Sequence, residues 1–98
     1  LYDSSHPALL KLIKGVIDAG TKAGIEVSLC GEMAGDPKLT KLLIGLGLTN
    51  FSMHPSSLLK VKKVILESEF SKVKSKAKKI LNTHDKIEIE NLINNLNN

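Results

Sequence analysis

A short apolar run that leads directly into a cysteine, two glycines and an Asp-Pro pair constrains this chain more than any other feature. Residues 25–29 are rich in branched side chains and predict a short buried strand. Cys30 falls where that strand should end, while Gly31 and Gly35 permit sharp turns and close approach to the backbone. Asp36 and the proline after it are typical of a helix start. We therefore expect a strand, a reactive loop and a helix, with Cys30 at the ligand-facing carboxyl end of the strand.

The order of elements predicts a parallel arrangement of strands. One helix is expected before this strand, from Pro7 to Gly24, and one after it, from Pro37 to about Leu46. A second strand is expected at residues 50–53, and further helices follow the His-Pro turn at residues 54–55. Two strands joined by a crossover helix pair in parallel but leave two open edges. The chain is therefore expected to be a piece of a larger parallel sheet or barrel.

Apolar side chains recur at helical spacing in five segments, and each set is expected to face inward. The sets are Leu9, Leu12, Ile13, Val16 and Ile17; Leu39, Leu42, Leu43 and Leu46; Leu58, Val61, Val64 and Ile65; Val73, Ala77, Ile80 and Leu81; and Ile89, Leu92, Ile93 and Leu96. The last two helices are expected at about residues 71–81 and from residues 83–85 onward, with a frayed tail at residues 94–98.

Composition narrows the class of protein. A chain of 98 residues makes one small domain, and its start at Leu1 without a methionine is typical of the middle of a longer protein. No apolar run of about 18 residues predicts a membrane span, and the single cysteine fits a cytoplasmic protein. All fourteen basic residues are lysines. Because bidentate phosphate clamps usually use arginine, any such clamp is expected outside this chain.

The loop Cys-Gly-Glu-Met-Ala-Gly-Asp, from Cys30 to Asp36, resembles the signature loop of phosphoenolpyruvate (PEP)-utilising enzymes. Within that family it is most similar to enzyme I, the PEP–protein phosphotransferases of the bacterial sugar phosphotransferase system. The likeness extends over about residues 2–67, through His-Pro-Ala-Leu-Leu at 6–10, Leu-Leu-Ile-Gly-Leu-Gly-Leu at 42–48 and Phe-Ser-Met at 51–53. The remaining residues match only by their helical pattern.

The resemblance implies an α/β fold, the C-terminal quarter of a (β/α)8 TIM barrel. Residues 1–67 would be the last βα units, with the last two parallel strands, and residues 68–98 a C-terminal helical closure. The family moves the phosphoryl group of PEP to a histidine on a separate domain and then to a histidine phosphocarrier protein. Its arginine clamp and Mg2+ ligands would lie outside residues 1–98, so the fragment alone would be inactive. The parent enzyme would be a cytoplasmic homodimer.

Cys30 is the catalytic residue that the resemblance implies, as the acid that protonates the enolate of pyruvate. A thiol suits this task, because it is mostly protonated at neutral pH yet can release its proton to carbon. Gly31 would let the substrate approach, and Glu32 could reach the substrate or orient the loop. The alternative for Glu32 is a solvated or backbone-capping carboxylate. Met33 is expected to pack in the core, and no metal site is expected from this chain alone.

Three other interpretations remain open. Pyruvate phosphate dikinase and PEP synthase share the cysteine loop and differ in the phosphoryl acceptor. A non-enzymatic interaction module could instead associate through open sheet edges or the amphipathic C-terminal helices. Eight lysines at residues 60–79 could contact nucleic acid, but the stretch lacks arginine and interleaved aromatic residues, which favours a solvated face.

Overall fold

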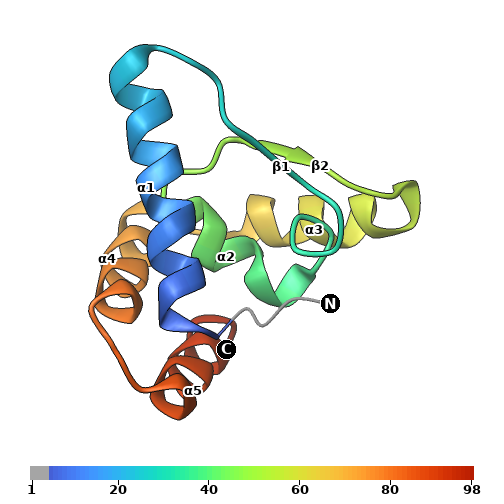
Figure 1. Cartoon of the computed structure of the whole chain (residues 1–98). Coiled ribbons are helices and arrows are strands. Elements are labelled where there is room, and N and C mark those ends of the chain that lie inside the picture. Colours follow the sequence, from blue (N-terminus) through green and yellow to red (C-terminus); the bar gives the residue numbers. More distant parts are fainter. Residues whose placement is uncertain (1–4) are drawn as a thin grey trace.

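The computed structural model describes residues 5–98, which form a mixed α/β fold with two parallel strands and five helices (Figure 1). The elements in chain order are α1 (Pro7–Ala23), β1 (Ser28–Cys30), α2 (Pro37–Gly45), β2 (Asn50–Ser52), α3 (Pro55–Glu67), α4 (Phe70–Leu81) and α5 (Lys86–Leu96). Tyr2, where the resemblance begins, lies outside the described residues. The expected element order is confirmed.

The helix boundaries follow the sequence signals. His6 caps α1, where its Nδ1 accepts a hydrogen bond from the Ala8 amide at 3.1 Å, and Gly24 ends the helix with a φ of 72°. Asp36 caps α2 in the same way, accepting from the Lys38 amide at 3.0 Å. Proline in the first turn suits both helices because its fixed φ is already helical and no amide donor is lost.

The core is centred on α2 rather than on the sheet. Leu39, Leu42, Leu43 and Leu46 are each at most 2% exposed. They meet the buried residues of α4 and α5, which include Ile80 and Ile89. In Figure 1, α2 lies between α4 and α5 on one side and the two strands on the other. The helices that follow α3 therefore complete a core that two short strands cannot provide.

The two strands are shorter and more exposed than the sequence predicts. They pair in parallel, with Ser28 opposite Asn50, Leu29 opposite Phe51 and Cys30 opposite Ser52. Leu29 and Phe51 are only half buried against the core, and Ile25 precedes the strand and is 67% exposed. The prediction of a buried strand at residues 25–29 is wrong for this chain, because helices cover just one face of the sheet.

Two predicted helix faces are also corrected. In α1, Leu12 and Val16 are 64% and 50% exposed, whereas Leu10 and Ile17 are buried. In α3 only Val61 is buried; the other predicted inward residues are exposed or, for Val64, half buried. Spacing shows which side chains share a face, but burial also requires a second element against that face.

The C-terminal helices agree better with expectation. Val73, Ala77 and Ile80 of α4 are buried, as are Ile89, Ile93 and Leu96 of α5. The predicted frayed tail at residues 94–98 is wrong in part. Helix α5 continues to Leu96, and the Asn97 side chain donates a hydrogen bond of 2.7 Å to the Lys38 carbonyl in α2. Within residues 5–98, no helix has the length and apolarity needed to span a membrane.

Candidate functional site

Cys30 is the last residue of β1 and is exposed. It therefore lies at the carboxyl end of a parallel strand, the end at which α/β folds bind their ligands. Leu29, its neighbour, turns toward the helices and packs against the core. Since successive side chains along a strand point to opposite faces, Cys30 lies on the face that the helices leave uncovered.

The uncovered face of the sheet is polar. Ser28 and Cys30 alternate with Leu29 in β1, and Asn50 and Ser52 occupy the paired positions in β2. Paired residues of parallel strands lie on the same face, so Ser52 is the direct neighbour of Cys30. Of these four residues, Cys30 and Ser52 lie at the carboxyl ends of their strands, where a thiol and a hydroxyl face a ligand together.

The loop after Cys30 turns sharply and is anchored at its middle. Gly31 has a φ of 83°, a conformation that L side chains rarely adopt. The Gly35 amide then closes the turn by donating to the Gly31 carbonyl at 3.1 Å. Met33 is 9% exposed and Ala34 is fully buried, which confirms the expected packing role of Met33. Glu32, between the turn and this anchor, is exposed.

The loop after β2 places His54 at the same end of the sheet. His54 caps α3, and its Nδ1 accepts from the Ser56 amide at 3.2 Å and lies 2.9 Å from the Ser56 hydroxyl. Because Nδ1 acts as an acceptor, the proton of the neutral ring resides on Nε2. Ser57 follows in the first turn of α3, and its amide donates to the His54 carbonyl at 2.9 Å.

An open pocket of about 530 Å³ lies between these two loops. Its lining residues are Gly31, Glu32, Gly35, Asp36, His54 and Ser57. Cys30 is not among them but directly precedes Gly31. A methyl group added at Gly35 would lie 3.2 Å from the Ser57 hydroxyl oxygen, so a glycine here keeps the space between the loops open. The pocket joins the predicted loop to a second loop that the sequence had not singled out for ligand binding.

The described residues do not fit a complete magnesium site. Mg2+ requires near-octahedral oxygen ligands, usually with one or two carboxylates and several waters. Residues 5–98 contain no group of three or more His, Cys, Asp or Glu side chains that could hold a metal ion. In the pocket, Asp36 already accepts the capping hydrogen bond from Lys38, so Glu32 is the carboxylate that faces solvent.

The structure thus brings Cys30, Gly31 and Glu32 together at one end of the sheet. It adds Ser52, His54 and Ser57, which sequence reasoning did not assign to the site. The predicted parallel pair indicates that both strands end at the same edge of the sheet, but it does not give the register that makes Ser52 the neighbour of Cys30. No comparable signal marks His54, whose position before a proline is equally typical of a helix cap.

The chain is similar to known proteins over most of its length. Residues 1–70 match the family model described as PEP-utilising enzyme, PEP-binding domain. Over 85 residues the chain is 45% identical to a protein of Cupriavidus necator named phosphoenolpyruvate-protein phosphotransferase, covering 87% of this chain and 14% of that protein.

Proteins with the same name in two further bacteria are similarly related. The identity is 46% over 101 aligned positions for Buchnera aphidicola subsp. Baizongia pistaciae, covering 100% of this chain and 18% of the relative. For the protein of Borreliella burgdorferi the identity is 44% over 88 residues, which cover 90% of this chain and 15% of the relative. The chain thus spans only 14% to 18% of the length of these three relatives.

Proposed function

This chain belongs to the family of PEP-utilising enzymes, whose PEP-binding domain matches residues 1–70, and we propose that it forms the Cys30-bearing end of a phosphoenolpyruvate–protein phosphotransferase. The whole enzyme would transfer the phosphoryl group of PEP to one of its own histidines and then to a histidine phosphocarrier protein. The position of Cys30 supports the proposal, because Cys30 is exposed at the carboxyl end of β1, the end at which α/β folds bind their ligands.

We further propose that the chain is the last quarter of a TIM barrel, with β1 and β2 as its final strands. Residues 1–67 would supply the last βα units, and residues 68–98 would close the barrel from outside. Large apolar side chains on α3 support this arrangement, since Leu58, Leu59 and Leu66 are 53%, 79% and 75% exposed. Further βα units would cover these side chains and pair with the free strand edges.

Cys30 would act as the general acid that completes the reaction. Transfer of the phosphoryl group breaks the bond from phosphorus to the C2 oxygen and leaves the enolate of pyruvate. The electron pair of the enolate then forms a bond from C3 to the thiol proton, which yields the methyl group of pyruvate and a Cys30 thiolate. Because Cys30 is exposed, the thiolate can regain its proton from water. The reverse sequence begins with removal of a methyl proton from pyruvate by the thiolate.

The pocket beside Cys30 would receive the substrate. Gly31 turns the chain away from the strand end, which leaves space for the substrate beside the thiol. Glu32 is exposed in the pocket and would orient the loop or bind a substrate water. Mg2+ and the groups that clamp the phosphate would be held by residues outside this chain, so the fragment alone would be inactive. The parent enzyme would be a homodimer in the cytoplasm.

The test is substitution of Cys30 by alanine and by serine in the complete protein. Turnover of PEP to pyruvate should fall at least about 100-fold in both variants, which is the usual contribution of a positioned general acid. The phosphorylated enzyme should also exchange the methyl protons of pyruvate for deuterium in deuterium oxide. The rate of this exchange should fall in both variants together with turnover. Cys30 variants that retain wild-type turnover and exchange would contradict the proposal.

Ser28→Ala is the matched control. Ser28 lies on the same face of β1, two residues before Cys30, and is outside the lining of the pocket. Its replacement should change turnover less than about threefold.

The phosphoryl acceptor separates this proposal from the dikinase and synthase alternatives. A labelled phosphoryl group that passes to a nucleotide instead of a histidine phosphocarrier protein would favour one of them.

A further inference from the structure

A second pocket lies between α1, α2 and α4 and is lined by several lysines. Its volume is about 260 Å³, and its lining includes Lys14, Lys74, Lys78 and Asn82 beside the end of α2 at Leu46. We propose that this pocket binds a small multivalent oxyanion of the phosphate type. The site is separate from the Cys30 loop, because it lies at the opposite end of α2, a helix whose nine residues span about 13 Å.

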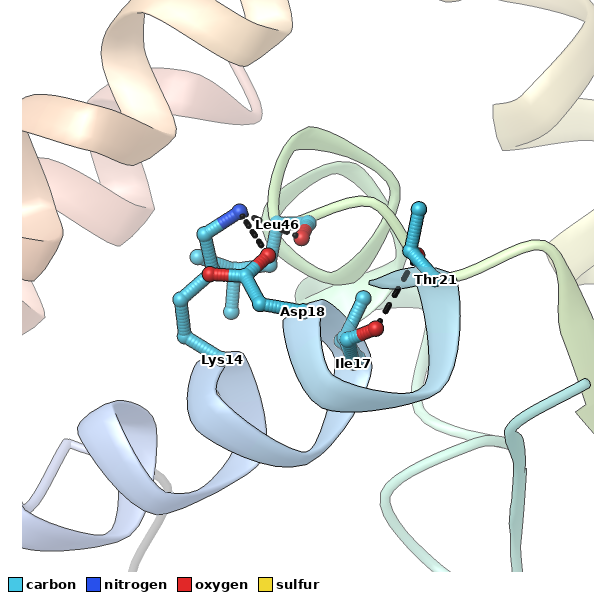
Figure 2. A network of polar contacts seen from close by, with 5 residues as sticks. All are labelled: Lys14, Ile17, Asp18, Thr21 and Leu46. Atoms are coloured by element: carbon cyan, nitrogen blue, oxygen red, sulfur yellow. Dashed lines mark hydrogen bonds and ion pairs between the residues drawn. The ribbon is translucent and has the colours of Figure 1, made fainter. Parts of the chain in front are cut away.

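The first ammonium group of the pocket is held in place. Figure 2 shows the Lys14 side chain reaching from α1 toward the end of α2, where its Nζ donates to the Leu46 carbonyl at 3.2 Å. The same Nζ lies 2.9 Å from the Asp18 carboxylate. Two partners leave one of the three ammonium donors of Lys14 available. A positioned donor loses less side-chain entropy on binding than a mobile one.

The other two ammonium groups have no neutralising partner in the part of the chain that the structure describes. These groups belong to Lys74 and Lys78, which are one helical turn apart in α4, and neither side chain makes a hydrogen bond or ion pair among residues 5–98. Like charges four residues apart repel each other across a helix turn. An anion seated between them and Lys14 would relieve this repulsion.

The opposite flank of α4 differs although its lysine spacing is the same. There Lys72 and Lys76 also lie four residues apart, but Lys72 pairs with Glu69 at 3.1 Å. Glu67 and Glu69 line the pocket beside them. The excess positive charge is therefore specific to the flank that faces α1, where Asp18 is the carboxylate paired with Lys14.

Two further properties favour a small anion. Three of the last four carbonyl groups of α4 are already occupied, since those of Lys78 and Lys79 accept from the Asn82 amide and that of Ile80 accepts from the Thr83 amide. This weakens the negative end of the helix dipole at the pocket. A volume of about 260 Å³ is below the range of pockets for drug-sized ligands, so it suits one or two phosphate groups.

Lysine footprinting in the complete protein tests the proposal. Inorganic pyrophosphate is titrated up to about 10 mM at constant ionic strength, and acylation of each lysine is followed by mass spectrometry. We expect acylation of Lys14, Lys74 and Lys78 to slow at least about threefold while that of Lys72 and Lys76 is unchanged. Equal protection of all five lysines, or protection of none, would overturn the proposal.

Two double variants then use Lys14 protection as a local readout. Lys74→Ala with Lys78→Ala should raise the pyrophosphate concentration for half-protection of Lys14 about tenfold, through loss of two charge contacts. Lys72→Ala with Lys76→Ala removes the same charge at the same spacing and should shift it less than about twofold. Equal shifts in both variants would mean that general electrostatics, and not the pocket, governs the effect. The readout is independent of turnover, so its outcome is separate from that of the Cys30 test.

Discussion

Gly45 lies where α2 packs against α4, and its replacement by alanine tests whether that contact organises the core. A Cβ atom at position 45 would lie 2.5 Å from the Ala77 Cβ and 2.7 Å from the Val73 carbonyl oxygen. Both distances are shorter than real Cβ contacts. Since one of the two neighbouring atoms is backbone, the clash cannot be relieved by rotation of a side chain. The two helices would have to move apart.

The expected magnitude follows from two opposing effects. Overpacking a well-packed core costs about 1–3 kcal/mol, and a clash with backbone belongs at the upper end of that range. Alanine also has a higher helix propensity than glycine. This difference stabilises the folded state by at most about 1 kcal/mol, and by less at the last position of a helix. We therefore expect Gly45→Ala to lower the free energy of unfolding by about 1–2 kcal/mol. For a chain of this size, that lowers Tm by about 4–16 °C.

Gly15→Ala is the matched control, because Gly15 is in the middle of α1 and a Cβ there meets nothing within 4 Å. It should raise the free energy of unfolding by about 0.5–1 kcal/mol through helix propensity alone. Urea unfolding followed by circular dichroism at equal protein concentration measures both variants. The reasoning is refuted if Gly45→Ala is as stable as the wild type, or if both alanines shift stability in the same direction.

Three further substitutions examine the core, the loop and the uncovered surface. Leu43→Ala removes a fully buried side chain and should lower the free energy of unfolding by about 2–5 kcal/mol in urea titrations. Gly31→Ala places a side chain at a φ of 83° and should cost about 1–2 kcal/mol in the same assay, with a lower rate of pyruvate formation by the complete protein. Leu59 is 79% exposed, so Leu59→Lys should change the free energy of unfolding of residues 1–98 by less than about 0.5 kcal/mol. If further βα units cover α3 in the complete protein, the same substitution should lower the stability of that protein by more than about 1 kcal/mol. Equal effects in residues 1–98 and in the complete protein would contradict the proposal that further βα units pack against α3.

Local signals predicted the elements of this fold better than they predicted burial. The proline and cap residues that start α1 and α2, and the glycines that follow both helices, act within one turn and do not depend on the rest of the chain. Burial depends on partners. Leu12 and Leu58 continue apolar stripes, yet they are exposed because no element of residues 5–98 packs against them. The stripes of α4 and α5 were predicted correctly because α2 covers them.

The sequence predicted the part of the candidate site that follows β1, but not the part that β2 and the loop after it contribute. The position of Cys30 followed from the end of an apolar run, which is a local feature. The positions of Ser52 and His54 beside it depend on the register of β2 against β1, which is a property of two segments more than twenty residues apart. Register is set by the pairing and packing of both strands, and a single short apolar run does not specify it.

The position of Cys30 depends on α2 more than on the sheet. Strand β1 has three residues and, among residues 5–98, pairs with one neighbour. Such a pair has little stability of its own. The loop from Gly31 is instead fixed at its other end, where Met33 and Ala34 are buried and Asp36 begins α2. Because Gly45 sets how closely that helix approaches α4, a shift of α2 would displace the loop and the thiol with it. Gly45→Ala should therefore reduce turnover in the complete protein even at temperatures where the variant remains folded.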